Sequence, residues 1–173
     1  IISTITGLKI NEIEKVIGAD KKIIRSMPNT AISVRKSLTC ICSNDTGSQY
    51  LDLCVSIFNS VGKAIIIDEN KMQSATVMCA SGIAFWMRII RAMAQGGVEL
   101  GFESKDSLEI SYRTAHGAIS LLEKNKTHPE EEIDKVTTPS GCTIKGIIEM
   151  ENKGLSSAII HGVISSHEKI NNI

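Results

Sequence analysis

Short hydrophobic runs of strand length alternate with helical patterns along residues 1–70. Hydrophobic residues recur at helical spacing over 10–17 and 48–59. Each strand-like run stops at a glycine, proline, asparagine or aspartate, and these runs lie at 1–6, 22–27, 37–43 and 64–67. Strands that alternate with helices predict an α/β unit with a largely parallel sheet.

Residues 71–173 show helical patterns only, so the expected fold class is α/β plus all-α, with a domain boundary near residue 70. We expect an interruption at Ala80-Ser81-Gly82 and then a central buried helix over 83–94, which is apolar nearly all round. Further helices are expected at 72–78, around 104–122, from 129, at 144–150 and at 155–170. A stripe suited to packing on another helix consists of Leu108, Tyr112, Ala115, Ile119 and Leu122. Several such stripes in residues 71–173 are too apolar for a helical bundle that stays monomeric.

Composition and charge narrow the choice of partners. Lys plus Arg (19) balance Asp plus Glu (19), and the aromatic residues are one Trp, two Tyr and three Phe. A nucleic-acid binder needs a basic surface or stacking aromatics, so no nucleic-acid partner is expected. The longest uncharged stretch, 72–87, is shorter than the roughly 20 residues of a membrane span, so no membrane partner is expected either.

The ends and the cysteines indicate a cytoplasmic protein. The start, Ile1 to Gly7, has no basic segment before an apolar run, so it is read as a strand already under way rather than a signal peptide. None of the five cysteines forms a C-x-x-C pair, and the four histidines have no metal-ligand spacing. We therefore expect a reducing compartment and no metal site.

The turn before residue 144 is the most informative segment for chemistry. Pro139 and Gly141 predict a turn, and a helix begins near Thr143. Free amides at a helix start favour a small anion, and hydroxyl donors are supplied there by Thr138, Ser140 and Thr143. A capped helix after an ordinary turn is the simpler alternative. Cys142 allows a third interpretation, because a thiol at a helix N-terminus can become nucleophilic.

A second segment, Arg25 to Thr30, directly follows a predicted strand. Ligands of parallel α/β sheets bind at the carboxyl ends of strands, so Asn29 and Thr30 could reach a nucleotide beside the rigid Pro28. An ordinary Pro-Asn turn is the alternative. The glycine-rich stretch 96–101 follows a helix and lacks the G-x-G-x-x-G order, so it is interpreted as a helix end. His128 is expected to cap a helix.

These segments resemble, in order and over nearly the whole chain, the pyrroline-5-carboxylate reductase family. The matching stretches are 3–7 (STITG), 25–31 (RSMPNTA), 80–85 (ASGIAF), 95–102 (QGGVELGF), 113–118 (RTAHGA), 128–129 (HP) and 136–144 (VTTPSGCTI). The resemblance implies part of a Rossmann-like dinucleotide-binding domain over 1–70 and a helical substrate-binding and dimerisation domain over 71–173. It also implies a homodimer or larger homo-oligomer.

The resemblance implies hydride transfer from NADPH or NADH to the C=N bond of pyrroline-5-carboxylate, giving L-proline. The nicotinamide end would meet Thr6, Gly7, Met27, Pro28 and Asn29. The substrate carboxylate would meet Thr138 and the amides of Gly141, Cys142 and Thr143, and Thr143 would lie near the imine nitrogen as the catalytic residue. The substrate-binding residues implied are Thr138, Ser140, Gly141, Cys142 and Thr143.

Four positions depart from the family pattern: Ile83, Arg113, Ser140 and Cys142. Ser140 stands where the family has glycine, at a position where a positive φ can be needed. The glycine-rich turn that grips the pyrophosphate is expected upstream of Ile1, so weak NAD(P)H binding is expected of residues 1–173 alone. Two alternatives stay open: a non-catalytic helical oligomerisation module, and a divergent imine reductase lacking its cofactor domain.

Overall fold

The computed structural model describes residues 1–171 and divides into two compact units. Unit 1 comprises Ile1–Ala84 together with the chain from His161 onward, and unit 2 comprises Phe85–Ile160. The domain boundary near residue 70 was inferred from sequence pattern and stays a prediction. Residues 172–173 of the predicted helical domain lie outside the described residues.

Unit 1 contains a four-stranded sheet in the order β1-β2-β3-β4. The strands are β1 (Ile2–Ser3), β2 (Ile24–Met27), β3 (Ser37–Ser43) and β4 (Gly62–Ile66). β1 pairs with β2 and β3 with β4 in parallel, but β2 and β3 are antiparallel. The expected largely parallel sheet is therefore wrong for the central pair. The connection 28–36 is too short for a parallel crossover, which needs roughly a dozen residues or more.

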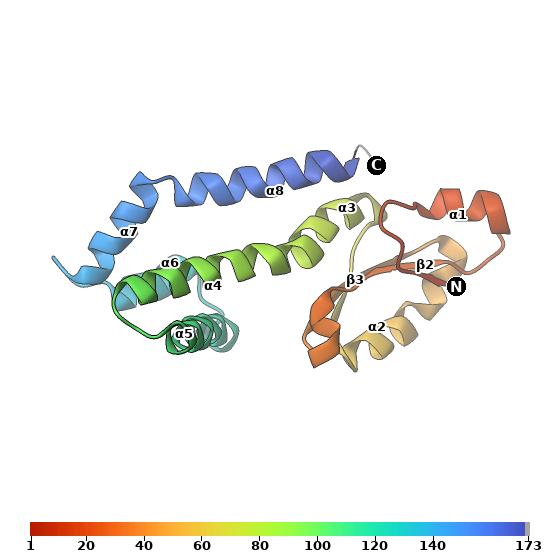
Figure 1. Ribbon diagram of the computed structural model, residues 1–173. Helices are drawn as coiled ribbons and strands as arrows, with labels where there is room; N and C mark the ends of the chain where they lie inside the picture. Colours follow the sequence, from red (N-terminus) through yellow and green to blue (C-terminus); the bar gives the residue numbers. More distant parts are fainter. Residues whose placement is uncertain (172–173) are drawn as a thin grey trace. The chain divides into compact units, whose positions relative to one another are not determined.

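Helices cover both faces of the sheet (Figure 1). On one face, α1 (Ile10–Ile17) and α3 (Met72–Ala75) pack against a core that contains Ile23, Met27 and Cys40. On the other face, Cys54 and Phe58 of α2 (Leu51–Asn59) pack on Ile24 and Ile41. The strand period of two explains this division, because neighbouring residues of β2 point to opposite faces.

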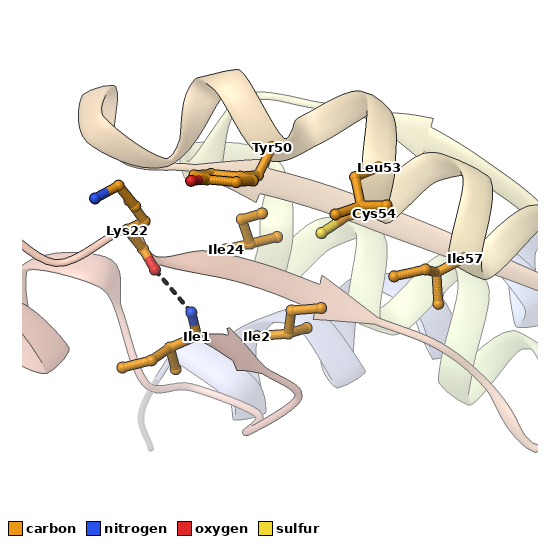
Figure 2. Close-up of a pocket in the computed structure, with 8 residues that line it drawn as sticks. All are labelled: Ile1, Ile2, Lys22, Ile24, Tyr50, Leu53, Cys54 and Ile57. Atoms are coloured by element: carbon orange, nitrogen blue, oxygen red, sulfur yellow. Dashed lines mark hydrogen bonds between the residues drawn. The ribbon is translucent and has the colours of Figure 1, made fainter.

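The outer edge of β1 is open. The predicted strand 1–6 is wrong in length, since β1 covers two residues and pairs only with β2. Beside it lies a groove of about 230 Å³ whose walls include the first residue, Ile1, the strand residues Ile2 and Ile24, and Leu53 and Ile57 of α2 (Figure 2). The Ile1 nitrogen donates to the Lys22 carbonyl oxygen at 2.8 Å. The apolar side of α2 thus extends beyond the edge strand β1.

The chain does not break at Ala80-Ser81-Gly82 as predicted. It continues from α3 through a π-helical segment, Thr76–Ser81, into α4 (Gly82–Glu99). A π-helical turn absorbs an additional residue without ending the helix, and it weakens the usual backbone ladder locally. The sequence signal was therefore real, but it marks a change of helix type.

Unit 2 contains the rest of α4 and the helices α5 (Ser104–Asn125), α6 (Pro129–Val136) and α7 (Cys142–Asn152), and α8 (Leu155–Asn171) begins in it. The predicted burial of 83–94 is wrong for this single chain: Trp86 is 61% and Met87 63% exposed. Among the described residues, every buried hydrophobic side chain belongs to unit 1. The stripe on α5 is exposed too, with Leu108 and Ile119 each at 48%. The helices of unit 2 therefore present apolar faces that this chain alone does not cover.

One continuous helical stretch within residues 1–171, Glu69–Glu99, is long and apolar enough to cross a membrane by length and composition. It carries Arg88 and Arg91, and charged residues are costly inside a bilayer. A single helix of this kind is weak evidence, because helices of water-soluble proteins pass the same test. The absence of a membrane partner stays a prediction.

Candidate active site

The predicted cofactor residues lie at or just after the ends of two neighbouring strands, β1 and β2. Because β1 and β2 run parallel, with Ile2 opposite Ile24, the chain leaves both strands at the same edge of the sheet. Thr6 is exposed, and Gly7 has a φ of +83°, a conformation that disfavours side chains. Met27 is buried in the sheet, while Pro28 and Asn29 are half-buried.

Both polar atoms of the Asn29 side chain, Oδ1 and Nδ2, form hydrogen bonds. Its Oδ1 accepts from the Ala31 amide at 3.0 Å, which caps the short 3₁₀ helix Thr30–Val34. Its Nδ2 donates to the carbonyl oxygen of Cys79 in the π-helical segment at 2.9 Å. The Asn29 amide donates to Ser37 Oγ at 3.1 Å. Asn29 is thus a fixed link between β2, β3 and the π-helical segment.

Ser37 and Cys79 were missed as supports of this loop. For Ser37 the available signal was the Ser-x-Thr spacing with Thr39, which places both hydroxyls on one face of β3 with their oxygens 3.2 Å apart. For Cys79 the side chain gives no signal, because its backbone carbonyl makes the contact.

Arg25 carries a buried charge beside this strand end. Its side chain is 4% exposed, and Nη1 donates to Glu69 Oε1 at 2.8 Å. The same carboxylate oxygen accepts from the Ile10 amide at 2.7 Å. Burial raises the pKa of the nearby Cys42 thiol to about 11, and the Glu69 charge adds to that effect.

The predicted substrate turn is formed by four residues before α7. The Gly141 amide donates to the Thr138 carbonyl oxygen at 2.9 Å, and α7 begins at Cys142. Ser140 has a φ of +60°, so the position where the family has glycine does adopt a left-handed conformation. A Cβ at Gly141 would lie 2.5 Å from Thr138 Oγ1 and 3.0 Å from its carbonyl oxygen. The turn therefore needs glycine at 141 for space, and its strained backbone lies at 140.

The start of α7 offers donors to a small anion. Thr138, Ser140, Cys142 and Thr143 are exposed, and no side chain caps the helix in the described structure. The first amides of an α-helix have no intrahelical partner, so the amides of Cys142 and Thr143 are available. The helix dipole adds partial positive charge at this end.

The structure places the two sets of predicted residues in different units: 6–7 and 27–29 in unit 1, and 138–143 in unit 2. His128 caps α6, as predicted, with Nδ1 accepting from the Glu130 amide at 3.3 Å. Within residues 1–171, no group of three or more His, Cys, Asp and Glu is arranged to hold a metal ion.

The fold is that of a dinucleotide-dependent reductase with a helical domain, as similar solved structures show. Solved structures superpose on nearly the whole chain, which identifies unit 1 as part of a Rossmann-like sheet and the following helices as a helical domain. Pyrroline carboxylate reductase of Plasmodium falciparum, solved with NADP bound, is 28% identical, with a TM-score of 0.89, and the match covers 98% of this chain and 69% of that one. The 1-pyrroline-5-carboxylate reductase of Streptococcus pyogenes is 27% identical, with a TM-score of 0.94 and coverages of 99% and 67%.

Residues 69–173 match the family model described as pyrroline-5-carboxylate reductase dimerisation. Pyrroline-5-carboxylate reductase 2 of Dictyostelium discoideum is 45% identical over 98% of this chain and 62% of its own length. Pyrroline-5-carboxylate reductase 1 of the same organism is 44% identical over 98% of this chain and 33% of its own. The chain belongs to the pyrroline-5-carboxylate reductase family. It spans between a third and about two thirds of the length of these curated relatives.

Proposed function

We propose that the protein reduces the C=N bond of pyrroline-5-carboxylate to give L-proline, with NADPH or NADH as hydride donor. The observation that carries this proposal is the turn 138–141, which leads into the uncapped start of α7. A small cyclic imine with one carboxylate matches an exposed site of this kind, with two free amides and neighbouring hydroxyls.

Carboxylate binding is assigned to the Cys142 and Thr143 amides, helped by the hydroxyls of Thr138 and Ser140. The Gly141 amide closes the turn in this structure, so Gly141 contributes by allowing the close approach to Thr138. Anchoring the carboxylate fixes the direction of the imine ring, which lowers the entropic part of the barrier.

Thr143 is proposed as the catalytic residue. Its hydroxyl lies on the first turn of α7, one residue beyond Cys142, and is exposed. When hydride adds to the imine carbon, the nitrogen must gain a proton. A hydroxyl hydrogen-bonded to that nitrogen stabilises the developing charge and can relay the proton.

The loops after β1 and β2 fit the nicotinamide end of the cofactor. Thr6, Gly7, Met27, Pro28 and Asn29 lie at the edge of the sheet where ligands of Rossmann-like folds bind. NAD(P)H supplies the hydride when bound. The hydrogen bonds of Asn29 to Ser37 and Cys79 keep the Pro28–Asn29 loop in place before any ligand arrives.

We further propose that residues 1–70 are part of a larger dinucleotide-binding sheet. The open edge of β1 and the apolar groove beside it are the surface to which another strand would add (Figure 2). The proposed location is the cytoplasm, in keeping with five cysteines that are all free thiols.

The test is steady-state NAD(P)H oxidation that depends on pyrroline-5-carboxylate, measured on the protein expressed with its complete coding sequence. Thr143→Val should lower kcat by roughly a hundredfold, the low end for loss of a proton-transfer group. Thr143→Ser is the matched control and should retain most turnover, since it keeps the hydroxyl. Full activity in Thr143→Val would contradict the role of Thr143.

A second pair of outcomes separates the remaining interpretations. Cys142→Ser keeps the backbone amide and removes the thiol, so loss of turnover in that variant would favour a cysteine-dependent enzyme. A protein that forms an oligomer but shows no turnover with either cofactor would favour the non-catalytic helical module.

A further inference from the structure

Two cysteine sulfurs face each other across the boundary between the sheet and the π-helical segment. Cys40 lies on β3 and is 1% exposed, and Cys79 lies on the π-helical segment and is half-buried. Their Sγ atoms are 3.6 Å apart, and one thiol hydrogen-bonds to the other. A disulfide has an S–S distance of about 2.05 Å, so the sulfurs need to approach by only about 1.5 Å.

We propose that Cys40 and Cys79 are an oxidation site, where a low-molecular-weight disulfide converts the two thiols into an intrachain disulfide. The modification is independent of the proposed reductase activity, so the two claims can fail separately. It would cross-link β3 to the π-helical segment, directly beside the carbonyl oxygen that holds the Asn29 side chain. Met27 is paired with Cys40 in the strand register, which places the cross-link next to the Pro28–Asn29 loop.

The other cysteines are poorly placed to compete. Cys54 packs on the opposite face of the sheet, against Ile24 and Ile41. Cys142 belongs to unit 2. Cys42 lies on the same strand and face as Cys40 but is 4% exposed and packs in the core around Ile10 and Ile13.

The reaction proceeds in two exchanges that balance. The Cys79 thiolate attacks the small disulfide, a mixed disulfide forms at Cys79, and one small thiolate leaves. Cys40, as its thiolate, then attacks the Cys79 sulfur and expels the second small thiolate, which takes up a proton. Two protein thiols are oxidised and one external disulfide is reduced to two thiols.

Burial determines the order of the two exchanges. It raises the pKa of the Cys40 thiol to about 12, and the neighbouring Cys79 adds to this effect. A buried, protonated thiol is a poor first nucleophile, so the half-buried Cys79 reacts first and Cys40 resolves the mixed disulfide.

The test uses the full chain carrying Cys142→Ser, which removes the exposed thiol and leaves four cysteines. The reduced protein is incubated with oxidised glutathione, denatured and alkylated with N-ethylmaleimide. Before alkylation we expect a mass lower than that of the reduced protein by two hydrogen atoms. After alkylation we expect two maleimide adducts and a tryptic cross-link between peptides 37–63 and 72–88. Reduction of the oxidised protein with dithiothreitol before alkylation should restore four alkylated cysteines.

Matched variants in the same background locate the link. Cys42→Ala and Cys54→Ala should each preserve the cross-link, whereas Cys79→Ser should abolish it. Four alkylated cysteines after oxidation, glutathione retained on Cys79, or a link through Cys42 or Cys54 would each overturn the proposal.

Discussion

Two buried serines on neighbouring strands of unit 1 differ in their hydrogen bonding. Ser37 Oγ on β3 accepts from the Asn29 amide and interacts with Thr39 Oγ1. Ser26 Oγ on β2 is a buried polar atom without a hydrogen-bond partner in the described structure. A buried hydroxyl without a partner loses its hydrogen bonds to water and forms none within the protein, which lowers stability.

Replacing the two serines by alanine should therefore change the free energy of unfolding in opposite directions. Ser26→Ala should raise the free energy of unfolding by about 1 kcal/mol, because it removes an unsatisfied buried group. Ser37→Ala should lower it by about 1–2 kcal/mol, because it leaves the Asn29 amide without its acceptor. Urea unfolding of both variants beside the parent protein measures the difference. Destabilisation by Ser26→Ala would show that its hydroxyl has a partner.

Glu69 connects three elements of unit 1. It precedes α3, pairs with Arg25 of β2 and accepts a hydrogen bond from the first residue of α1. Arg25 is almost fully buried, so loss of this carboxylate leaves an uncompensated charge inside the unit. The contact holds β2, α1 and the start of the long helix together beside the proposed cofactor edge.

Glu69→Ala should lower the free energy of unfolding by about 2 kcal/mol, less than the loss of a fully buried pair, since the Glu69 side chain is 33% exposed. The matched control is Asp68→Ala. Its carboxylate lies 4.0 Å from Lys71, both side chains are exposed, and the change should stay within about 0.5 kcal/mol. Equal effects of the two substitutions in urea unfolding would contradict the role given to Glu69.

Most elements could be predicted from periodicity, and the exceptions have physical causes. The helix 10–17 and the strand 37–43 agree with the structure residue for residue, because each has a complete amphipathic or buried pattern and a clear stop signal. The direction of β2 relative to β3 depends on the length of their connection, which hydrophobic pattern does not report. Position 140 adopts a positive φ, a conformation that the family's glycine at this position suggests on steric grounds. The hydrogen bond from Asn29 to the backbone carbonyl of Cys79 could not be predicted, because any residue at position 79 would offer the same carbonyl.

The two units of the molecule differ in how far they bury their own hydrophobic residues. Unit 1 contains both hydrophobic cores, whereas the helices of unit 2 expose Trp86, Met87, Leu108 and Ile119. Exposed apolar faces of this extent indicate interaction surfaces. The match of residues 69–173 to a dimerisation family model agrees with such a surface. We infer that the helical faces of two or more copies cover one another.

Light scattering should therefore give a mass of at least twice the 18.7 kDa of the chain. Ile119→Glu should shift the population toward monomer, because it puts a charge into the stripe on α5. Val16→Glu is the matched control: Val16 is 84% exposed on α1 of unit 1 and should leave the mass unchanged. A monomeric parent protein would contradict the packing argument.

The exposed turn before α7 is proposed to bind an imine whose carbon receives a hydride. The most direct test of this proposal follows the hydride itself. The protein expressed with its complete coding sequence is incubated with pyrroline-5-carboxylate and NADPH deuterated at the transferable position of the nicotinamide, and the product is examined by mass spectrometry and NMR. We predict proline with one deuterium at C5, the former imine carbon. Absence of proline, or proline without the label, would contradict the account.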